Sequence, residues 1–299
     1  MPAFRAAPVR VRVPATSANL GPGFDSAGLA LTLYDDVVVR ISDSGLVVDV
    51  AGEGADDLPR NSRHLVVRSL RTTFERLGGQ PRGLEVVCAN RIPHSRGLGS
   101  SSAAICAAVL AARALVVGGE DQLDDDAVLA LATELEGHPD NVAACLRGGA
   151  TFAWGDPVQV LRLDTHDDLA PVALVPTTRS STKKARGLLP DAVPFADAAL
   201  NAGRAALLPT ALSAAPQLLF AATEDRLHQQ YRASAMPRSN ELVRALRDEG
   251  VPAVISGAGP TVLALVTTAD VDRVIELAPP GWTVLALSVA ADGAQTLPL

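Results

Sequence analysis

The sequence predicts an α+β fold made of two domains, and three observations support this prediction. Short β-branched runs typical of strands mix with longer stretches typical of helices, without the regular strand–helix alternation of a doubly wound parallel sheet. The length of 299 residues suits one large domain or two of ordinary size. Hydrophobic residues make up 48% of the chain, so it can fill a complete core.

The first half of the chain contains four expected strands and three expected helices. The strands are β-branched, largely alternating runs at Val9–Pro14, Asp36–Ser42, Gly45–Gly52 and Gly83–Ala89. The helices are expected at Arg63–Leu77, Ser102–Val117 and Asp124–Glu136. The third helix begins with three aspartates, in the position where carboxylates favour the helix dipole.

The second half of the chain mixes the two kinds of element again. Strands are expected at Pro171–Pro176, Ala253–Ser256, Thr261–Thr267 and Thr283–Ser288, and helices at Phe195–Ala206, Gln217–Tyr231 and Ser239–Glu249. Between the two halves, the Pro- and Asp-containing stretch Trp154–Asp168 is predicted to be a loop. We therefore expect one domain over residues 1–160 and a second over residues 161–299.

The charge, the N-terminus and the cysteines restrict the classes of function. A net charge of −7 argues against nucleic acid as a main partner, because phosphate backbones need a basic face. The stretch Met1–Val13 is interrupted by three arginines and has no apolar signal-peptide core, and no apolar run is long enough to span a membrane. Three well-separated cysteines without metal-site spacing indicate reduced thiols, so we expect a cytoplasmic protein.

The second of four motifs along the chain, Ile92–Ala104, follows an expected strand and opens an expected helix. Gly97 and Gly99 permit tight turns and a close approach of the backbone. Free N–H groups at the helix N-terminus, together with three serine hydroxyls, then form a cradle for phosphate. The alternative is an ordinary glycine-containing turn. The motif is not a Walker A loop, because neither of the two lysines follows a glycine.

Three further loops contain chemically useful side chains. Pro14–Asp25 offers an amide, Asn19, and a carboxylate, Asp25, directly after a strand. Glu134–Asn141 gathers acids, a histidine and an amide at a helix end, where carboxylates can hold Mg²⁺. Ile255–Val262 is a glycine-rich link between two apolar strands. Each loop also has a purely structural interpretation, as a cap or a strand connection.

In this order and spacing, the four motifs resemble the signature of the GHMP kinase superfamily. The resemblance implies a ribosomal-protein-S5-like N-terminal domain and a ferredoxin-like C-terminal domain, with the site between them. Three phrases, Ser17–Asp25, Glu136–Asn141 and Asp225–Arg232, are similar to the homoserine kinase family. The first loop has no lysine, which argues against mevalonate kinases and diphosphocytidyl-methylerythritol kinases.

The resemblance implies Mg²⁺- and ATP-dependent phosphorylation of L-homoserine to O-phospho-L-homoserine, a step of threonine biosynthesis. One alternative is a GHMP kinase that acts on another small alcohol, and another is a nucleotide-binding module without catalysis. The expected partners are L-homoserine and ATP, with no nucleic acid and no membrane. The sequence leaves the oligomeric state open, with a homodimer as one option.

The resemblance also assigns the nucleotide-binding residues. The ATP phosphate loop would comprise Pro93, His94, Ser95, Arg96, Gly97, Leu98, Gly99, Ser100, Ser101, Ser102 and Ala103. Ser101 and Glu136 would hold Mg²⁺, with Glu134 as a rival because only Gly137 separates Glu136 from the histidine. Many relatives have an Asn where this chain has His64, so the adenine contact stays open.

The remaining assignments concern the substrate. Its binding residues would be Asn19, Asp25, His138, Arg186 and Arg232. The two arginines would hold its carboxylate, which an Arg fork matches better than Lys, and Asp25 would hold its ammonium. Asp140, Asn141 and Glu136 would be the catalytic residues. Asp140 would either accept the hydroxyl proton or only position the substrate, and we favour positioning, with Asn141 orienting the hydroxyl.

Overall fold

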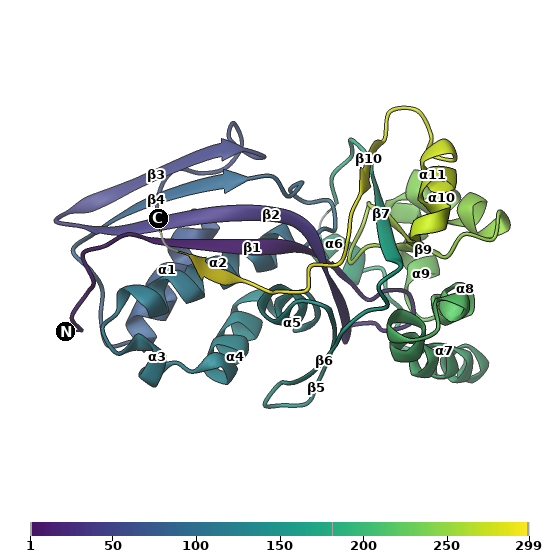
Figure 1. The fold of residues 1–299 in the computed structure, drawn as a ribbon, viewed down its shortest axis with the longest axis horizontal. Helices are drawn as coiled ribbons and strands as arrows, with labels where there is room; N and C mark the ends of the chain where they lie inside the picture. The colour runs from purple at the N-terminus through teal and green to yellow at the C-terminus, as the bar shows by residue number, and fades with distance from the viewer. Residues whose placement is uncertain (1, 181, 298) are drawn as a thin grey trace.

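A mixed seven-stranded sheet forms the left part of the molecule in Figure 1, a computed structural model that describes residues 2–180, 182–297 and 299. Its strands are β1 (Val9–Ala18), β2 (Ala27–Ser42), β3 (Gly45–Gly52), β4 (Gly83–Asn90), β5 (Ala150–Trp154), β6 (Gln159–Leu163) and β11 (Gln295–Leu297). The main order is β11-β1-β2-β4-β3, and β5 pairs with β2 and β6. The pairing is antiparallel except between β3 and β4.

Strands β1 and β2 extend beyond the predicted runs. The prediction ended the first strand at Pro14, and proline cannot donate a ladder hydrogen bond. In the structure, a register shift between Pro14 and Ala15 accommodates the proline, and pairing with β2 continues to Ala18. The extension takes the polar start of the first motif, Thr16 and Ser17, into the buried end of the sheet.

Helices lie on one face of this sheet (Figure 1). They are α1 (Leu65–Arg76), α2 (Ser100–Leu115), α3 (Gly119–Gln122), α4 (Asp125–Glu136) and α5 (Asp140–Arg147). The central helix α2 is rich in alanine and buried along most of its length. Its small side chains let it pack against β1 and β2 as well as α1, α4 and α5.

The junction between α4 and α5 determines where three polar residues lie. The Asp124 side chain caps the start of α4 by accepting a hydrogen bond from the Ala127 N–H at 2.8 Å. Gly137, with a φ of +91°, ends the same helix in the left-handed conformation. Helix α5 then begins at Asp140, so Glu136 ends one helix while Asp140 and Asn141 open the next.

A four-stranded antiparallel sheet forms the second half. Its strands are β7 (Leu169–Val175), β8 (Ala253–Ile255), β9 (Val262–Thr267) and β10 (Thr283–Ala286), in the order β10-β7-β9-β8. Helix α10 (Pro237–Asp248) precedes β8, and α11 (Val271–Glu276) connects β9 to β10. This connectivity and strand order are those of a ferredoxin-like unit. The predicted α+β class with a ferredoxin-like second half is confirmed.

Two predicted elements are wrong in detail. The stretch Trp154–Asp168 is not a loop, because β5 and β6 form a hairpin across it with Trp154 opposite Gln159. The helix predicted over Gln217–Tyr231 is interrupted. The chain instead forms α8 (Leu219–Ala222) and α9 (Gln229–Arg232) with a turn between them, in which the Asp225 carboxylate accepts backbone N–H groups.

The remaining helices of the second half are α6 (Thr182–Arg186) and α7 (Phe195–Ser213). The last strand, β11, returns to the first sheet and pairs with β1. The division of the chain near residue 160 stays a prediction. In the part of the chain that the structure describes, no helix has the length and hydrophobicity needed to cross a membrane.

Candidate active site

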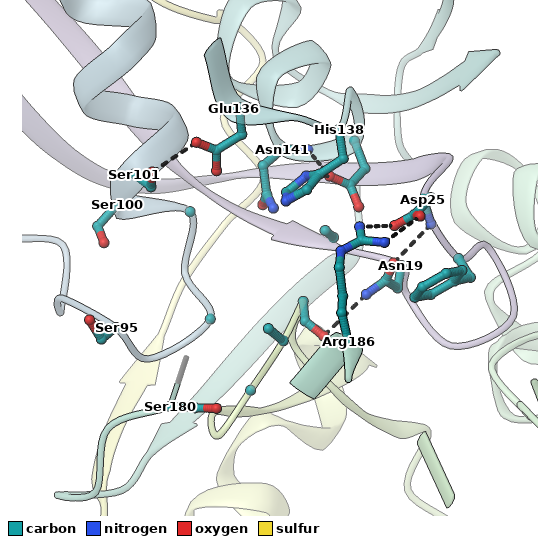
Figure 2. Close-up of a pocket in the computed structure, with 18 of the residues that line it drawn as sticks. Asn19, Asp25, Ser95, Ser100, Ser101, Glu136, His138, Asn141, Ser180 and Arg186 are labelled. Atoms are coloured by element: carbon teal, nitrogen blue, oxygen red, sulfur yellow. Dashed lines mark hydrogen bonds and ion pairs between the residues drawn. The ribbon is translucent and has the colours of Figure 1, made fainter. Parts of the chain in front are cut away.

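A cavity of about 320 Å³ lies where loops from the two sheets meet, and all four sequence motifs contribute to it. Figure 2 shows the serines of the second motif on one side of this cavity and Asn19, Asp25 and Arg186 on the other, with His138 and Asn141 between them. Its lining residues are Ala18, Asn19, Phe24, Asp25, Ser95, Gly97, Gly99, Ser100, Ser101, Glu136, His138, Asp140, Asn141, Ser180, Arg186, Arg232, Gly257, Ala258 and Gly259.

The second motif forms a tight loop between β4 and α2. Gly97 and Gly99 have φ angles of +80° and +72°, which side chains disfavour. A Cβ at Gly99 would overlap the Thr16 Oγ1 atom, and a Cβ at Gly97 would overlap the Ser256 carbonyl oxygen. The two glycines therefore let the loop turn and lie against its neighbours. The first N–H groups of α2 have no intrahelical acceptor and open onto the cavity.

Hydrogen bonds between the motifs hold this loop in place. The Ser256 hydroxyl donates to the Gly97 carbonyl at 2.5 Å and lies 2.8 Å from the Ser17 hydroxyl. The Asn19 amide donates to the Gly257 carbonyl at 3.1 Å and accepts from the Asp25 N–H at 3.0 Å. The fourth motif, whose role was open, thus ties the first two motifs together.

The residues predicted for the phosphate loop differ in their exposure to the cavity. Ser95, Gly97, Gly99, Ser100 and Ser101 line it, whereas His94 lines a second cavity nearby. Leu98, Ser102 and Ala103 are fully buried behind the loop. Arg96 donates to the carbonyls of residues 94, 176 and 177, and so anchors the loop to the second half of the chain. Pro93 precedes this turn.

The geometry distinguishes the two candidate magnesium carboxylates. At the start of α2, the Glu136 carboxylate accepts a hydrogen bond from the Ser101 hydroxyl at 2.8 Å (Figure 2) and another from the Ser102 hydroxyl at 2.8 Å. Glu134 is exposed and instead pairs with Arg76 at 2.8 Å. Serine and carboxylate oxygens are hard ligands that suit Mg²⁺. Of the two acids, Glu136 is therefore the one whose position fits an ion bound to phosphate.

The third motif places a carboxylate and an amide at the centre of the cavity. Asp140 is only 2% exposed, and its Oδ1 accepts from the Asn141 N–H at 2.7 Å and lies 2.8 Å from His138 Nδ1. The hydrogen bond to Asp140 raises the pKa of His138. The Asn141 Oδ1 accepts from the Thr16 hydroxyl at 2.8 Å, which leaves the Nδ2 of this cavity-lining amide available as a donor.

Two residues predicted to bind opposite ends of the substrate bind each other. The Arg186 guanidinium donates to both oxygens of Asp25, at 2.9 and 2.5 Å. Both side chains are about one-third exposed, and the guanidinium also lies over the Phe24 ring at 5.4 Å. The hydrogen bond to Asp25 raises the pKa of Arg186.

The second arginine is in a different situation. Arg232 is 3% exposed, lies over the Phe24 ring at 5.6 Å and contacts Nδ1 of His228. Its Nε has no hydrogen-bond partner, and among the described residues no acidic side chain forms an ion pair with it. Burial lowers its pKa to about 10, so the guanidinium stays charged at neutral pH. A buried, unpaired cation that lines a cavity is a ready site for an anion.

Behind Arg232 lies His228, which sequence reasoning did not single out. Its Nε2 lies 2.7 Å from the Gly21 carbonyl, so Nε2 carries the proton and Nδ1 is left to accept from Arg232. Burial lowers the pKa of His228 to about 4, so the ring is neutral. Its position in the phrase Asp225–Arg232 was the only signal that could have indicated this contact.

The second cavity, of about 220 Å³, shares Ser95, Ser100 and Ser101 with the first. It is lined mainly by apolar side chains, together with Asp35, His64, Asn90 and His94. His64, which the sequence left open, is 4% exposed here. Asp35 was missed, because the sequence prediction began the strand one residue later and a single acid in a β-branched run carries no functional signal.

Comparisons with known proteins agree with this geometry. Residues 64–149 match the GHMP kinases N terminal domain, and residues 199–277 match GHMP kinases C terminal. A homoserine kinase of Streptomyces avermitilis is 65% identical over 100% of this chain and 98% of its own length. A homoserine kinase of Streptomyces coelicolor is 64% identical over 100% of this chain and 97% of its own length.

Solved structures show the same architecture. The crystal structure of a homoserine kinase from Cytophaga hutchinsonii has a TM-score of 0.82 at 26% identity, over 99% of both chains. A mevalonate kinase of L. major shares the fold, with a TM-score of 0.71 at 16% identity over 97% of this chain and 98% of its own. The predicted two-domain fold and the predicted family are confirmed, and the chain belongs to the homoserine kinase family of GHMP kinases.

Proposed function

We propose that this homoserine kinase transfers the γ-phosphoryl group of ATP to the side-chain hydroxyl of L-homoserine in the cavity between the two sheets. The product is O-phospho-L-homoserine, an intermediate of threonine biosynthesis. The main support for the proposal is that one cavity has groups suited to an anion at each of its two ends. Free N–H groups of α2 form one anion site, and Arg232, buried and unpaired, forms another.

The Arg232 end favours a substrate with a carboxylate over other small alcohols. A carboxylate can accept two hydrogen bonds from a guanidinium, and burial strengthens the pairing. Mevalonate also has a carboxylate, but only an amino acid brings an ammonium group as well. Asp25 can bind that ammonium if Arg186 turns from Asp25 to the substrate carboxylate. The present Arg186–Asp25 pair then represents the cavity before the substrate enters.

Between the two anion sites, Asp140 and Asn141 surround the position of the hydroxyl. The Nδ2 of Asn141 can donate to the hydroxyl oxygen, because Thr16 already occupies its Oδ1. His138 and the Asn141 N–H occupy one oxygen of Asp140, and the other remains for the hydroxyl proton. A loose phosphoryl-transfer transition state requires little proton abstraction, so positioning remains the role we assign to Asp140.

Mg²⁺ would be held by Ser101 and Glu136 together with phosphate oxygens. The ion would neutralise charge on the transferring phosphoryl group. Within the described ranges no group of three or more His, Cys, Asp and Glu side chains could hold a metal. Mg²⁺ usually takes one or two carboxylates from a protein and its other ligands from phosphate and water, so Glu136 would be a sufficient acidic ligand.

An ADP-release assay tests the function directly. We expect activity with L-homoserine and ATP, and little with mevalonate, shikimate or galactose. L-homoserine amide, which lacks the negative charge, should be about 10- to 150-fold poorer in kcat/KM than L-homoserine, the usual effect of losing one hydrogen bond to a charged group. Equal activity with the amide would remove Arg232 from the substrate site, and activity only with another alcohol would overturn the function.

Location and assembly complete the proposal. We propose a cytoplasmic enzyme, since all three cysteines are free and buried. We propose a homodimer as its assembly, because Trp154 and Leu161 on the β5–β6 hairpin are 55% and 47% exposed and offer apolar surface to a second copy. Light scattering should give about twice the chain mass of 30.9 kDa, and a mass of one chain would contradict the dimer.

A further inference from the structure

The second cavity contains polar groups that no part of the chain satisfies. Both ring nitrogens of His64 are buried without a hydrogen-bond partner, although the side chain lines the cavity. Burial also lowers the pKa of His64, so the ring is neutral, with one N–H donor and one acceptor. Buried polar groups without partners are rare in folded proteins, and at a cavity wall they indicate a ligand that supplies the missing bonds.

Asp35 contributes a carboxylate to the same cavity. It is 5% exposed, and its Oδ1 accepts from the backbone N–H groups of Arg91 and Ile92 at 2.6 and 2.9 Å. These two bonds fix the orientation of the carboxylate at the start of the phosphate loop. Within the part of the chain that the structure describes, Oδ2 has no partner and is the atom left for the cavity. The charges of Asp36 and Glu53 also act on Asp35, and both groups are acidic.

We propose that Asp35 determines the purine specificity of this kinase by accepting a hydrogen bond from the 6-amino group of adenine, with His64 bonding the adjacent ring nitrogen. The inference rests on the proposed function, because the cavity receives a base only if the adjoining loop binds the phosphates. The shared residues Ser95, Ser100 and Ser101 place the two cavities next to each other at the phosphate loop.

The chemistry of the 6-position makes this proposal selective. Adenine presents an amino group there, which donates to a carboxylate oxygen. Hypoxanthine and guanine present a carbonyl oxygen, which cannot donate and is repelled by the Asp35 charge. Unsubstituted purine presents neither group and would leave Oδ2 unpaired. A site built to pair with a donor discriminates strongly against analogues that lack it.

The wild-type enzyme tests the proposal with three phosphoryl donors and L-homoserine: ATP, inosine triphosphate and purine riboside triphosphate. We expect kcat/KM to be highest for ATP and about 10- to 150-fold lower for the purine compound, the range for one bond to a charged group. The kcat/KM for inosine triphosphate should be lower still, because the Asp35 carboxylate repels the carbonyl oxygen of hypoxanthine. Equal kcat/KM for all three donors would overturn the proposal.

The substitution Asp35→Asn assigns the effect to this residue. Its Oδ1 can still accept from the two backbone N–H groups, while Nδ2 replaces the free oxygen and becomes a donor toward the cavity. We expect the preference to shift toward inosine triphosphate, with ATP losing at least about tenfold. Asp36→Asn is the matched control, because Asp36 pairs with Arg10 and Arg12 away from this cavity. Its ATP preference should equal that of the wild type, and an unchanged preference in Asp35→Asn would refute the proposal.

Two further outcomes are separable. If no nucleotide supports phosphorylation of homoserine, the proposed function fails, and calorimetric binding of ADP against inosine diphosphate still tests the base contact. If Asp35→Asn does not fold, a crystal structure of the wild type with a non-hydrolysable ATP analogue decides. The adenine amino nitrogen within about 3.2 Å of Oδ2 supports the proposal, and an amino group turned away from Asp35 refutes it.

Discussion

We propose that the cavity binds anions at two ends, and the two ends are built by different means. At the proposed phosphate end, the binding groups would be backbone N–H groups and serines from one continuous loop, Ser95–Ser101, which lines the cavity. At the Arg232 end, the guanidinium, the Phe24 ring and the His228 ring come together from segments about 200 residues apart in sequence, as the 2.7 Å contact between His228 and Gly21 illustrates. The first site depends on local backbone conformation, and the second on tertiary packing.

This difference affects how each site tolerates substitution. The phosphate loop cannot accept a side chain at Gly97 or Gly99, because the backbone angle and the surrounding atoms both oppose it. At the Arg232 end, the positive charge is the functional group, and a lysine ammonium can supply part of the interaction of the guanidinium with an anion. We therefore expect changes at the phosphate end to be close to all-or-none and changes at the carboxylate end to be graded.

The largest effect should come from Gly99→Val. The β-branched side chain would meet Thr16 and would have to adopt a φ near +72°, so the loop could not keep its shape. We expect ATP binding to be lost or its KM to rise sharply. Gly78→Val is a matched control, since Gly78 also has a positive φ of +94° but has open space around it. A folded Gly99→Val protein with normal ATP affinity would show that this loop does not bind the phosphates.

This contrast also explains what the sequence could predict. The glycine–serine loop was predictable because its turns, its donors and its helix are all encoded within a dozen residues. Helix α2 and the strands β3 and β4 were located to within two residues for the same reason. The Arg232 environment was not predictable in detail, since His228 and Phe24 are ordinary residues until the fold brings them together. The resemblance to a family supplied both arginines, but not the fact that Asp25 pairs with one of them.

Arg232→Lys and Arg186→Lys should separate the two arginines. Each change should weaken homoserine and spare ATP, by about 10- to 150-fold in kcat/KM for a bond to a charged group. For Arg232→Lys we expect a loss in kcat/KM near the upper end of this range, because the Arg232 guanidinium is buried. For Arg186→Lys we expect a loss near the lower end, because the Arg186 side chain is 37% exposed. Steady-state kinetics with each substrate varied checks this order. Wild-type homoserine kinetics in both variants would move the substrate site elsewhere.

Asp140→Asn should have a smaller effect on kcat than on KM. Asn retains the oxygen that accepts from His138 and Asn141, so the local geometry should survive. If Asp140 only positions the hydroxyl, the KM for homoserine rises by about tenfold and kcat changes within a few fold. If Asp140 is a general base, kcat falls by about 10²–10⁴ with a nearly normal KM. The second result would contradict our assignment.

The smallest effect concerns the stability cost of Asp35. Burial, only partly offset by hydrogen bonds from the Ile92 and Arg91 N–H groups, raises its pKa from 3.8 to about 6 in the folded state. The folded state therefore holds the proton more tightly than the unfolded state. The contribution of Asp35 to the unfolding free energy is therefore most favourable below about pH 4. It falls as the pH rises to about 6 and stays at that lower level above pH 6. The rise in pKa corresponds to at most about 3 kcal/mol.

Asparagine does not titrate, so Asp35→Asn should remove this loss. Relative to the wild type, the variant should gain about 1–3 kcal/mol of unfolding free energy between about pH 4.5 and pH 8, a rise of several degrees in Tm. The neighbouring Asp36 gives the opposite sign: burial raises its pKa, but hydrogen bonds from Arg10 and Arg12 outweigh this and lower it. Asp36→Asn should therefore lose stability over the same interval. Thermal melting of both variants at pH 4.5 and pH 8 tests the two signs. A stability change of the same sign in both variants would show that Asp35 is no more costly to ionise than Asp36, which is paired with two arginines. If the signs are opposite, as we expect, Asp35 lowers the stability of the folded protein. The second cavity would then keep a group for binding adenine at the expense of stability.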